Sequence, residues 1–291
     1  MIDKLQKHKL GYYEIKKKPT LAELQDYYAK KYYQESSSKS YKLNYTKDEI
    51  EYFRIRNERY YLATKNIRKI DKGNYLDVGC GEGFGLKFFK ERGYKVKGLD
   101  FSSSGVSKQN PDCLDDLVPG DLFDLLKIEI ESKNTFDIIC LNNVLEHVID
   151  PIDLLNALHR IIASNGVLII TVPNDFSIIQ KEALRRGHID KDFWVALPDH
   201  LSYFDKNSLV KICNETGFTV RDLLGDFPID WYLYHQGSNF IKDKSLGKNA
   251  HNARIQLECL ICSQSVDDML NFWRSMASIG SGRNLTIFLT K

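Results

Sequence analysis

A run of closely spaced glycines follows a short apolar stretch in the segment YLDVGCGEGFG, residues 75–85. Gly79, Gly81 and Gly83 form a G-x-G-x-G pattern, and Asp77 lies in the apolar stretch before it. Because glycine has no side chain, such a loop can adopt left-handed backbone conformations and let a ligand approach the backbone. The dinucleotide pattern needs its third glycine one position later, and no Gly-Lys-Ser/Thr triplet of a phosphate-binding loop follows. A phosphate, a dinucleotide and a sulfonium cofactor therefore have to be distinguished by the sequence downstream.

Two aspartates follow later apolar stretches at positions suited to a nucleoside. Asp100 ends the stretch YKVKGLD, about 20 residues beyond the glycine loop, where a carboxylate can accept two hydrogen bonds from a ribose diol. Asp121, in GDLFDL, could accept a hydrogen bond from the exocyclic amine of an adenine, or be an ordinary turn aspartate. Together with the glycine loop and Asp77, Asp100 indicates a ribose-containing cofactor.

These side chains need a sheet whose strand ends meet at one edge. Runs typical of β-strands occur near residue 75, up to Asp100, near residue 117, up to Leu141 and up to Val172, with helical stretches between most of them. One helix is marked by Asp150 as the N-cap and Pro151 at the first helical position. The alternation predicts parallel strands joined by right-handed crossovers, which is a doubly wound α/β sheet.

The chain is expected to divide into a helical N-terminal segment, 1–70, and an α/β domain, 71–291. Helical periodicity covers residues 21–33 and 47–70 in the first part. Two connections, at about 174–204 and 226–282, are too long for simple loops. We expect these two insertions to form a cap over the carboxyl edge of the sheet, where such folds bind ligands.

The order and spacing of four motifs give the chain a family resemblance. LDVGCGEG, GLDFS, GDL and FDIICLNNVLEHVIDP follow one another over roughly residues 55–225, and this series resembles the class I S-adenosylmethionine-dependent methyltransferases. The resemblance implies a seven-stranded sheet of order 3-2-1-4-5-7-6 with the last strand antiparallel, which suits NLTIFLT at the C-terminal end. It also implies S-adenosyl-L-methionine as cofactor and S-adenosyl-L-homocysteine as product.

The resemblance assigns a cofactor site to residues of these motifs. It places Gly79 and Gly81 around the amino-acid half of the cofactor and Asp100 on the ribose. The full expected set is Arg59, Asp77, Gly79, Cys80, Gly81, Gly83, Asp100, Phe101, Asp121, Leu122, Asn142, Asn143 and Val144. Arg59 has the spacing at which the similar ubiquinone-type small-molecule methyltransferases carry an arginine for the cofactor carboxylate. An exposed helix arginine is the alternative, and Arg54 and Arg56 are nearby competitors.

Two histidines are candidates for a catalytic base. A hydroxyl acceptor must lose its proton during methyl transfer, whereas a neutral amine need not. His147 follows the fourth strand beside the expected methyl group, although Glu146 and His147 could equally brace the loop. His200 lies among aromatic residues in the first insertion, and we favour it narrowly over His147 because those neighbours offer a dry pocket.

The insertions supply the candidate acceptor-binding residues. These are Trp194, Tyr203, His251, Arg254 and Arg283, although Arg254 and Glu258 are also spaced for a surface ion pair one helical turn apart. Segments such as WVALPDHLSYF and GKNAHNAR look similar to a bacterial methyltransferase subgroup associated with surface or flagellar glycan modification. This resemblance implies a carbohydrate-like or phosphate-linked small molecule as the acceptor.

Composition narrows the remaining possibilities. The 41 basic and 39 acidic residues give a net charge of +2, which argues against a dedicated nucleic-acid binder. No second ligand pair accompanies Cys259 and Cys262, so no metal site is predicted. Without an apolar signal core or a membrane-length stretch, we expect a soluble, cytoplasmic protein without a membrane partner.

Several other functions compete with O-methylation of a small molecule. They are N-methylation of a small amine, methylation of tRNA or protein, NAD-dependent oxidoreduction, and ligand binding without catalysis. The oxidoreductase alternative needs the longer glycine pattern and leaves LNNVLEHV unexplained.

Overall fold

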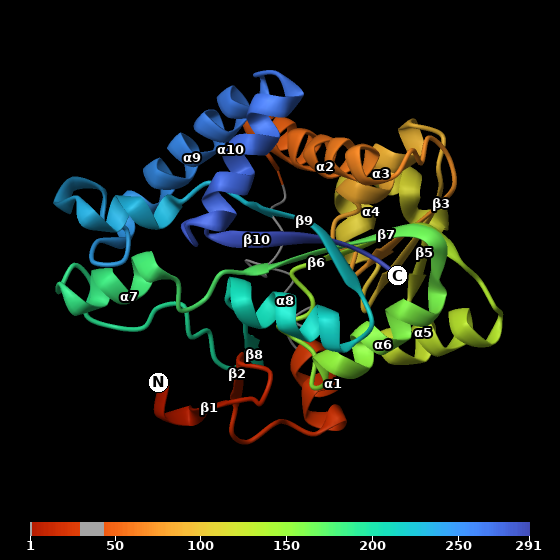
Figure 1. Cartoon of the computed structure of the whole chain (residues 1–291), viewed down its shortest axis with the longest axis horizontal. Helices are drawn as coiled ribbons and strands as arrows, with labels where there is room; N and C mark the ends of the chain where they lie inside the picture. Colours follow the sequence, from red (N-terminus) through yellow and green to blue (C-terminus); the bar gives the residue numbers. More distant parts are fainter. Residues whose placement is uncertain (1, 30–43) are drawn as a thin grey trace.

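The computed structural model describes residues 2–29 and 44–291, and its centre is a seven-stranded sheet (Figure 1). Its strands run in the spatial order β5-β4-β3-β6-β7-β10-β9, which confirms the expected 3-2-1-4-5-7-6 order. The strands are β3 (Asn74–Val78), β4 (Lys95–Asp100), β5 (Leu117–Pro119), β6 (Phe136–Asn142), β7 (Ile162–Pro173), β9 (Thr219–Gly225) and β10 (Asn284–Thr290). Strand β10 is antiparallel to both of its neighbours, as predicted, and the pairs from β5 to β7 are parallel.

Helices cover both faces of this sheet (Figure 1). One face carries α5 (Leu122–Glu131), α6 (Pro151–Ile161) and α8 (Lys206–Glu215), and the other carries α2 (Lys47–Ile67), α3 (Phe84–Glu91) and α10 (Val266–Ser278). The remaining α-helices among the described residues are α1 (Leu21–Ala29), α4 (Ser104–Gln109), α7 (Ile178–Arg185) and α9 (Gly247–Cys262). The predicted cap of α6 is present, because the Asp150 side chain accepts hydrogen bonds from the Ile152 and Asp153 amides.

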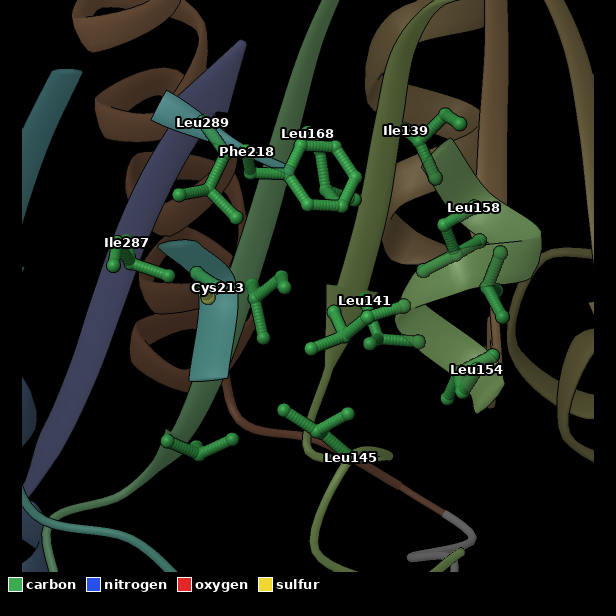
Figure 2. Close-up of a cluster of buried hydrophobic side chains, with 14 of the residues drawn as sticks. Ile139, Leu141, Leu145, Leu154, Leu158, Leu168, Cys213, Phe218, Ile287 and Leu289 are labelled. Atoms are coloured by element: carbon green, nitrogen blue, oxygen red, sulfur yellow. The ribbon is translucent and has the colours of Figure 1, made fainter. Parts of the chain in front are cut away.

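The core under α6 and α8 is built from branched aliphatic side chains. Leu141 and Leu168 from the central strands meet Leu154 and Leu158 of α6, and all four are fully buried (Figure 2). Strands that are buried on both faces read as continuous apolar runs, which is the pattern seen in the sequence of β6 and β7. This packing makes the sheet a rigid base for the loops at its carboxyl edge.

The N-terminal segment begins with strands, which the sequence analysis did not predict. Strands β1 (Leu5–Lys7) and β2 (Tyr13–Ile15) form an antiparallel hairpin, and β2 pairs in turn with β8 (Ser202–Tyr203). The helix predicted at 47–70 is α2, and the helix predicted at 21–33 is α1 as far as residue 29, with its remainder outside the described residues.

The two insertions carry structure of their own. The first, 174–204, contains α7 and β8, and the second, 226–282, contains three short 3-10 helices with α9 and α10. The 3-10 helices of the second insertion are η4 (Ile229–Tyr234), η5 (Gln236–Ser238) and η6 (Lys244–Leu246). Two other 3-10 helices lie outside the insertions: η1 (Ile2–Lys4) precedes β1, and η3 (Pro111–Asp116) precedes β5. Buried side chains from the first insertion and the N-terminal hairpin, among them Leu5, Trp194 and Tyr203, form one apolar cluster. Within 2–29 and 44–291, no helix combines the length and the apolar character that crossing a bilayer requires.

Candidate active site

The glycine loop between β3 and α3 has the backbone conformation that its sequence predicted. Gly79, Gly81 and Gly83 have φ angles of 73°, 56° and 77°, in the left-handed region that side chains disfavour. A Cβ atom at Gly79 would lie 2.4 Å from the Cγ2 atom of Val144, whereas one at Gly81 would have no atom of the described residues within 4 Å. Gly79 therefore allows the side chain of Val144 to pack closely against the loop, and the space beside Gly81 is open for a ligand.

An open cleft of about 180 Å³ lies over this loop. Its lining is Phe53, Arg56, Asn57, Tyr60, Asp77, Gly79, Cys80, Gly81, Glu82, Phe84, Gly85, Cys140 and Asn142. The structure thus brings together five residues expected from sequence, namely Asp77, Gly79, Cys80, Gly81 and Asn142. Of the α2 residues in the lining, Arg56 was considered only as a competitor of Arg59, and Phe53, Asn57 and Tyr60 were not predicted.

Asp77 is the buried acid of the cleft. Its side chain is 5% exposed and accepts a hydrogen bond from the Tyr75 hydroxyl at 3.2 Å. Burial raises the pKa of Asp77 to about 7, and the nearby positive charge of Arg56 acts in the opposite direction. A cationic group bound in the cleft would favour the carboxylate form.

Asp100 connects the end of β4 to the glycine loop. Its carboxylate accepts hydrogen bonds from the Gly81 amide at 2.8 Å and from the Ser102 amide at 3.1 Å. Burial raises the pKa of Asp100, while these amide donors lower it. The side chain lies beside the open space at Gly81, and its contact with a ribose stays a prediction.

The other predicted residues around the loop have structural partners. Asp121 caps α5 by accepting hydrogen bonds from the Phe123 and Asp124 amides, at 3.0 and 3.3 Å. Among the described residues, the cleft lining does not include Gly83, Phe101, Leu122, Asn143 or Val144. Gly83 is the N-cap of α3, and Asn143 has a φ of 55° directly after β6. The adenine contacts of Asp121 and Leu122 stay predictions.

Arg56 and Arg59 of α2 are placed differently from the sequence expectation. Arg59 is not among the described residues that line the cleft; its Nη1 atom lies 3.5 Å from Oε2 of Glu258, and its guanidinium lies 5.0 Å from the ring of Trp273. Both charged side chains of this pair are almost completely buried. Arg56 lines the cleft, and its buried Nε atom has no hydrogen-bond partner. Arg56 is therefore the arginine available to a ligand.

Three side chains from two distant segments meet beyond β6, and we call Glu146, His147 and His200 the Glu-His cluster. One ligand atom from each lies within 4.8 Å of the other two, and the imidazole centroids are 4.9 Å apart. The carbonyl oxygen of Glu146 accepts hydrogen bonds from the Leu201 and Ser202 amides, at 2.8 and 3.1 Å. These bonds hold the loop after β6 against the first insertion, so both predicted histidines lie in one site.

Glu146 has an unusual environment for a charged residue. It is 1% exposed, and among the described residues neither of its carboxylate oxygens has a hydrogen-bond partner. Burial raises the pKa of Glu146 to about 8. The Nε2 atom of His147 lies 3.8 Å from its Oε1 atom.

The predicted acceptor residues fall into two groups. Trp194 and Tyr203 are buried in one apolar cluster, and the Tyr203 hydroxyl donates to the carbonyl oxygen of His200 at 2.9 Å. Arg283 pairs with the fully buried Asp175, at 3.5 Å. In the second group, Arg254 forms the ion pair with Glu258 at 2.9 Å that its spacing suggested, but the pair is buried rather than on the surface, with side chains 15% and 1% exposed.

Further contacts tie this second group to α2. Arg254 also donates to the Tyr52 hydroxyl at 2.6 Å, and His251 lies 3.5 Å from Glu49. His251 and Arg254 therefore connect α9 to α2, on a different part of the molecule from Trp194 and Tyr203.

Comparison with known proteins gives a family match. A family model described as a methyltransferase domain matches residues 50–223. The ubiquinone biosynthesis O-methyltransferase of Psychrobacter arcticus is 25% identical over 160 residues, which are 52% of this chain and 60% of the relative. The protein of that name from Pseudomonas aeruginosa is 26% identical over 180 residues, which are 58% of this chain and 70% of the relative. The chain thus matches 60% and 70% of the lengths of these two relatives.

Solved structures share the fold at low sequence identity. An S-adenosylmethionine-dependent methyltransferase from Archaeoglobus fulgidus aligns with 83% of this chain and 94% of its own, with a TM-score of 0.52 and 20% identity. The plantazolicin methyltransferase BpumL in complex with S-adenosylhomocysteine aligns with 92% of this chain and 95% of its own, with a TM-score of 0.55 and 14% identity.

Proposed function

The chain belongs to the methyltransferase-domain family and is an S-adenosylmethionine-dependent methyltransferase, and we propose that it methylates a hydroxyl oxygen of a small polar acceptor. The observation that carries this proposal is the Glu-His cluster. It begins two residues after Val144, whose side chain lies against Gly79 of the cofactor loop. A hydroxyl acceptor has to lose a proton, and imidazole and carboxylate groups are suited to assist that loss. The names of the related O-methyltransferases support the same reaction class.

The cleft over the glycine loop has groups that fit the cofactor. The empty space at Gly81, which a side chain would fill, suits the amino-acid half, with Asp77 for its ammonium and Arg56 for its carboxylate. Asp100 would accept hydrogen bonds from the ribose. When bound, the cofactor supplies a methyl on a sulfonium: the acceptor oxygen bonds to that carbon, the carbon–sulfur bond breaks with its electron pair left on sulfur, and the acceptor proton is lost.

The residues of this chain act on the acceptor by placing it and assisting that proton loss. His200 and His147 are the two candidates from sequence, and their 4.9 Å ring separation makes them one group rather than alternatives at separate places. The ring of Tyr203 lies beside this group, with its centroid 6.0 Å from that of His200, whereas the buried Trp194 packs against Phe176 in the neighbouring apolar cluster.

The finer proposal is that the acceptor is carbohydrate-like or phosphate-linked, as in surface or flagellar glycans. Its support is the similarity of the insertion segments to glycan-modifying methyltransferases, together with the charged group formed by Arg283, Asp175 and Asp230. Arg283 lies 3.5 Å from Asp175 and 4.0 Å from Asp230, so donors and acceptors for hydroxyl groups are concentrated there. N-methylation of a small amine is the second candidate, because the buried Glu146 and Asp175 carboxyls could attract a cation.

An acceptor screen tests the proposal. The purified chain is incubated with S-adenosylmethionine carrying a labelled methyl group and with sets of phenols, sugars, sugar phosphates and amines. We expect label on oxygen and one S-adenosylhomocysteine released per methyl group. Transfer to amines alone would contradict O-methylation, and transfer to phenols but never to sugars would contradict the glycan-type acceptor.

A further inference from the structure

We propose that Thr171 and Thr286 are positioning residues for the cofactor: they orient the hydroxyl group of Tyr60, and Tyr60 in turn orients the side-chain amide of Asn142 in the cleft. The inference deepens the proposed function and rests on it for the placement of the amino-acid half of the cofactor. The chain of hydroxyl groups itself rests on the structure alone.

The register of the sheet brings three polar side chains together, and we call Asn142, Thr171 and Thr286 the polar row. Asn142 at the end of β6 pairs with Thr171 of β7, and Thr171 pairs in turn with Thr286 of β10. Residues that are directly paired on neighbouring strands present their side chains to the same face of the sheet. The polar row therefore crosses β6, β7 and β10 on one face, next to the carboxyl end of β6.

Tyr60 of α2 lies over the polar row. Its hydroxyl oxygen is 2.9 Å from Oγ1 of Thr171, which is 2.9 Å from Oγ1 of Thr286. Tyr60 and Asn142 line the cofactor cleft, whereas among the described residues Thr171 and Thr286 are not part of its lining. An effect of either threonine on the cofactor therefore has to pass through Tyr60 and Asn142.

The proton inventory gives this chain one direction. Oδ1 of Asn142 lies 3.5 Å from the Tyr60 hydroxyl and can only accept a hydrogen bond. Each hydroxyl has a single proton, so when Tyr60 donates to Asn142, Thr171 donates to Tyr60 and Thr286 donates to Thr171. The contact with Asn142 is long, and hydrogen bonds of a catalytic site commonly shorten when the ligand is bound. With Oδ1 held by Tyr60, the NH₂ group of Asn142 is available to the cofactor carboxylate.

The burial of these hydroxyl groups is a second, independent observation. Tyr60, Thr171 and Thr286 are each at most 5% exposed, and the two threonines interrupt the apolar stretches of β7 and β10. A buried hydroxyl group is costly unless it is hydrogen-bonded, and valine would fill the space of either threonine. Packing alone therefore does not explain the threonines, whereas orientation of Tyr60 at the cleft does.

Titration calorimetry on the full-length protein tests the inference, with S-adenosylhomocysteine and methylthioadenosine as probes. Methylthioadenosine lacks the amino-acid half, so the Asn142 amide has no carboxylate to bind. Thr171→Val should raise the Kd of S-adenosylhomocysteine about 2- to 12-fold, the equivalent of one net hydrogen bond, and leave the Kd of methylthioadenosine unchanged. Thr286→Val should act on the same probe alone by a smaller factor. Thr171→Ser keeps the hydroxyl group and should bind both probes as the wild type does.

A double variant shows whether Thr171 acts through Tyr60. Tyr60→Phe alone should weaken binding of S-adenosylhomocysteine, and the addition of Thr171→Val should cause no further loss, because the effects of residues in one hydrogen-bonded chain do not add. Thr290→Val is the matched control. Thr290 is buried at the opposite end of β10 from Thr286 and accepts a hydrogen bond from Arg221 at 2.9 Å, so its loss should change neither Kd.

Three results would overturn the role of the polar row: wild-type affinity for S-adenosylhomocysteine in both valine variants, equal weakening of the two probes, or a full additional loss in the double variant. Each of them leaves the proposed function intact. Methyl transfer to amines alone in the acceptor screen refutes the proposed function and leaves the polar row in place.

Discussion

Arg56 and Arg59 of α2 allow a decisive test of the cofactor site. Arg56 lines the cleft with an unpartnered Nε atom, whereas Arg59 is paired with Glu258 away from the cleft lining. We therefore expect Arg56→Gln to weaken binding of S-adenosylmethionine without a comparable loss of stability. Arg59→Gln should have the opposite pattern, because the buried Glu258 carboxylate loses one of its two arginine partners and keeps only Arg254.

The magnitudes follow from the two environments. Hydrogen bonds to charged groups contribute about 1.5–3 kcal/mol, so loss of the Arg56 contact to the cofactor carboxylate should raise Kd about 10- to 150-fold. In the Arg59–Glu258 pair the side chains are only 3% and 1% exposed. Removal of the only partner of a buried charge costs about 3–5 kcal/mol. Because Arg254 still pairs with Glu258 at 2.9 Å, this cost is an upper bound for the fall in the free energy of unfolding of Arg59→Gln.

Calorimetric titration with S-adenosylhomocysteine and urea unfolding measure the two effects separately. Arg54→Gln is the matched control, because Arg54 is on the same helix, is 51% exposed, and pairs with Glu51 on the surface. It should change neither quantity by much, as exposed ion pairs contribute about 0–1 kcal/mol. If Arg59→Gln weakens cofactor binding at unchanged stability while Arg56→Gln binds normally, the assignment of Arg56 is wrong.

Three further predictions concern the same site. Gly81→Val should abolish measurable cofactor binding in calorimetry. The valine side chain would fill the open space, and a β-branched residue is strained at a backbone φ of 56°. Normal binding would contradict the loop assignment. Cofactor affinity should rise about tenfold per pH unit up to the raised pKa of Asp77, about 7, and then level off. The reason is that the bound ammonium group favours the carboxylate form of Asp77, so binding below this pKa releases a proton from Asp77. Calorimetry from pH 5.5 to 8.5 checks this dependence, and Asp77→Asn should remove it. His200→Gln should lower turnover about 100-fold or more with cofactor Kd near wild type, and steady-state rates near those of the wild type would exclude His200 from the reaction.

The sheet and the cofactor loop could be predicted from the sequence because their determinants are local. Glycines at 79, 81 and 83 specify a left-handed turn wherever they follow a strand, and apolar runs specify strands buried on both faces. Asp150 before Pro151 specifies the start of α6 through its own hydrogen bonds to the next amides. Such signals depend on neighbours within a few residues, so a sequence carries them in full.

The choice between Arg56 and Arg59 was decided only by tertiary packing. Residues three apart on a helix are separated by about 60° around its axis, so periodicity places both on nearly the same face. What separates them is the position of Glu258 and Trp273, which belong to α9 and α10 in the second insertion. No local pattern around α2 contains that information.

The Glu-His cluster shows the same division between local and long-range determinants. The adjacency of Glu146 and His147 is visible in the sequence. The approach of His200 depends instead on a long-range contact, the hydrogen bond between the His147 ring and the carbonyl oxygen of Asp199, which lies 52 residues further along the chain. The strand β8 beside it is held by the N-terminal hairpin, through pairing with β2. The sequence by itself determined which chemical groups are present and which loop holds the cofactor. Only the tertiary structure decided which of those groups meet, because backbone hydrogen bonds between distant segments set their distances.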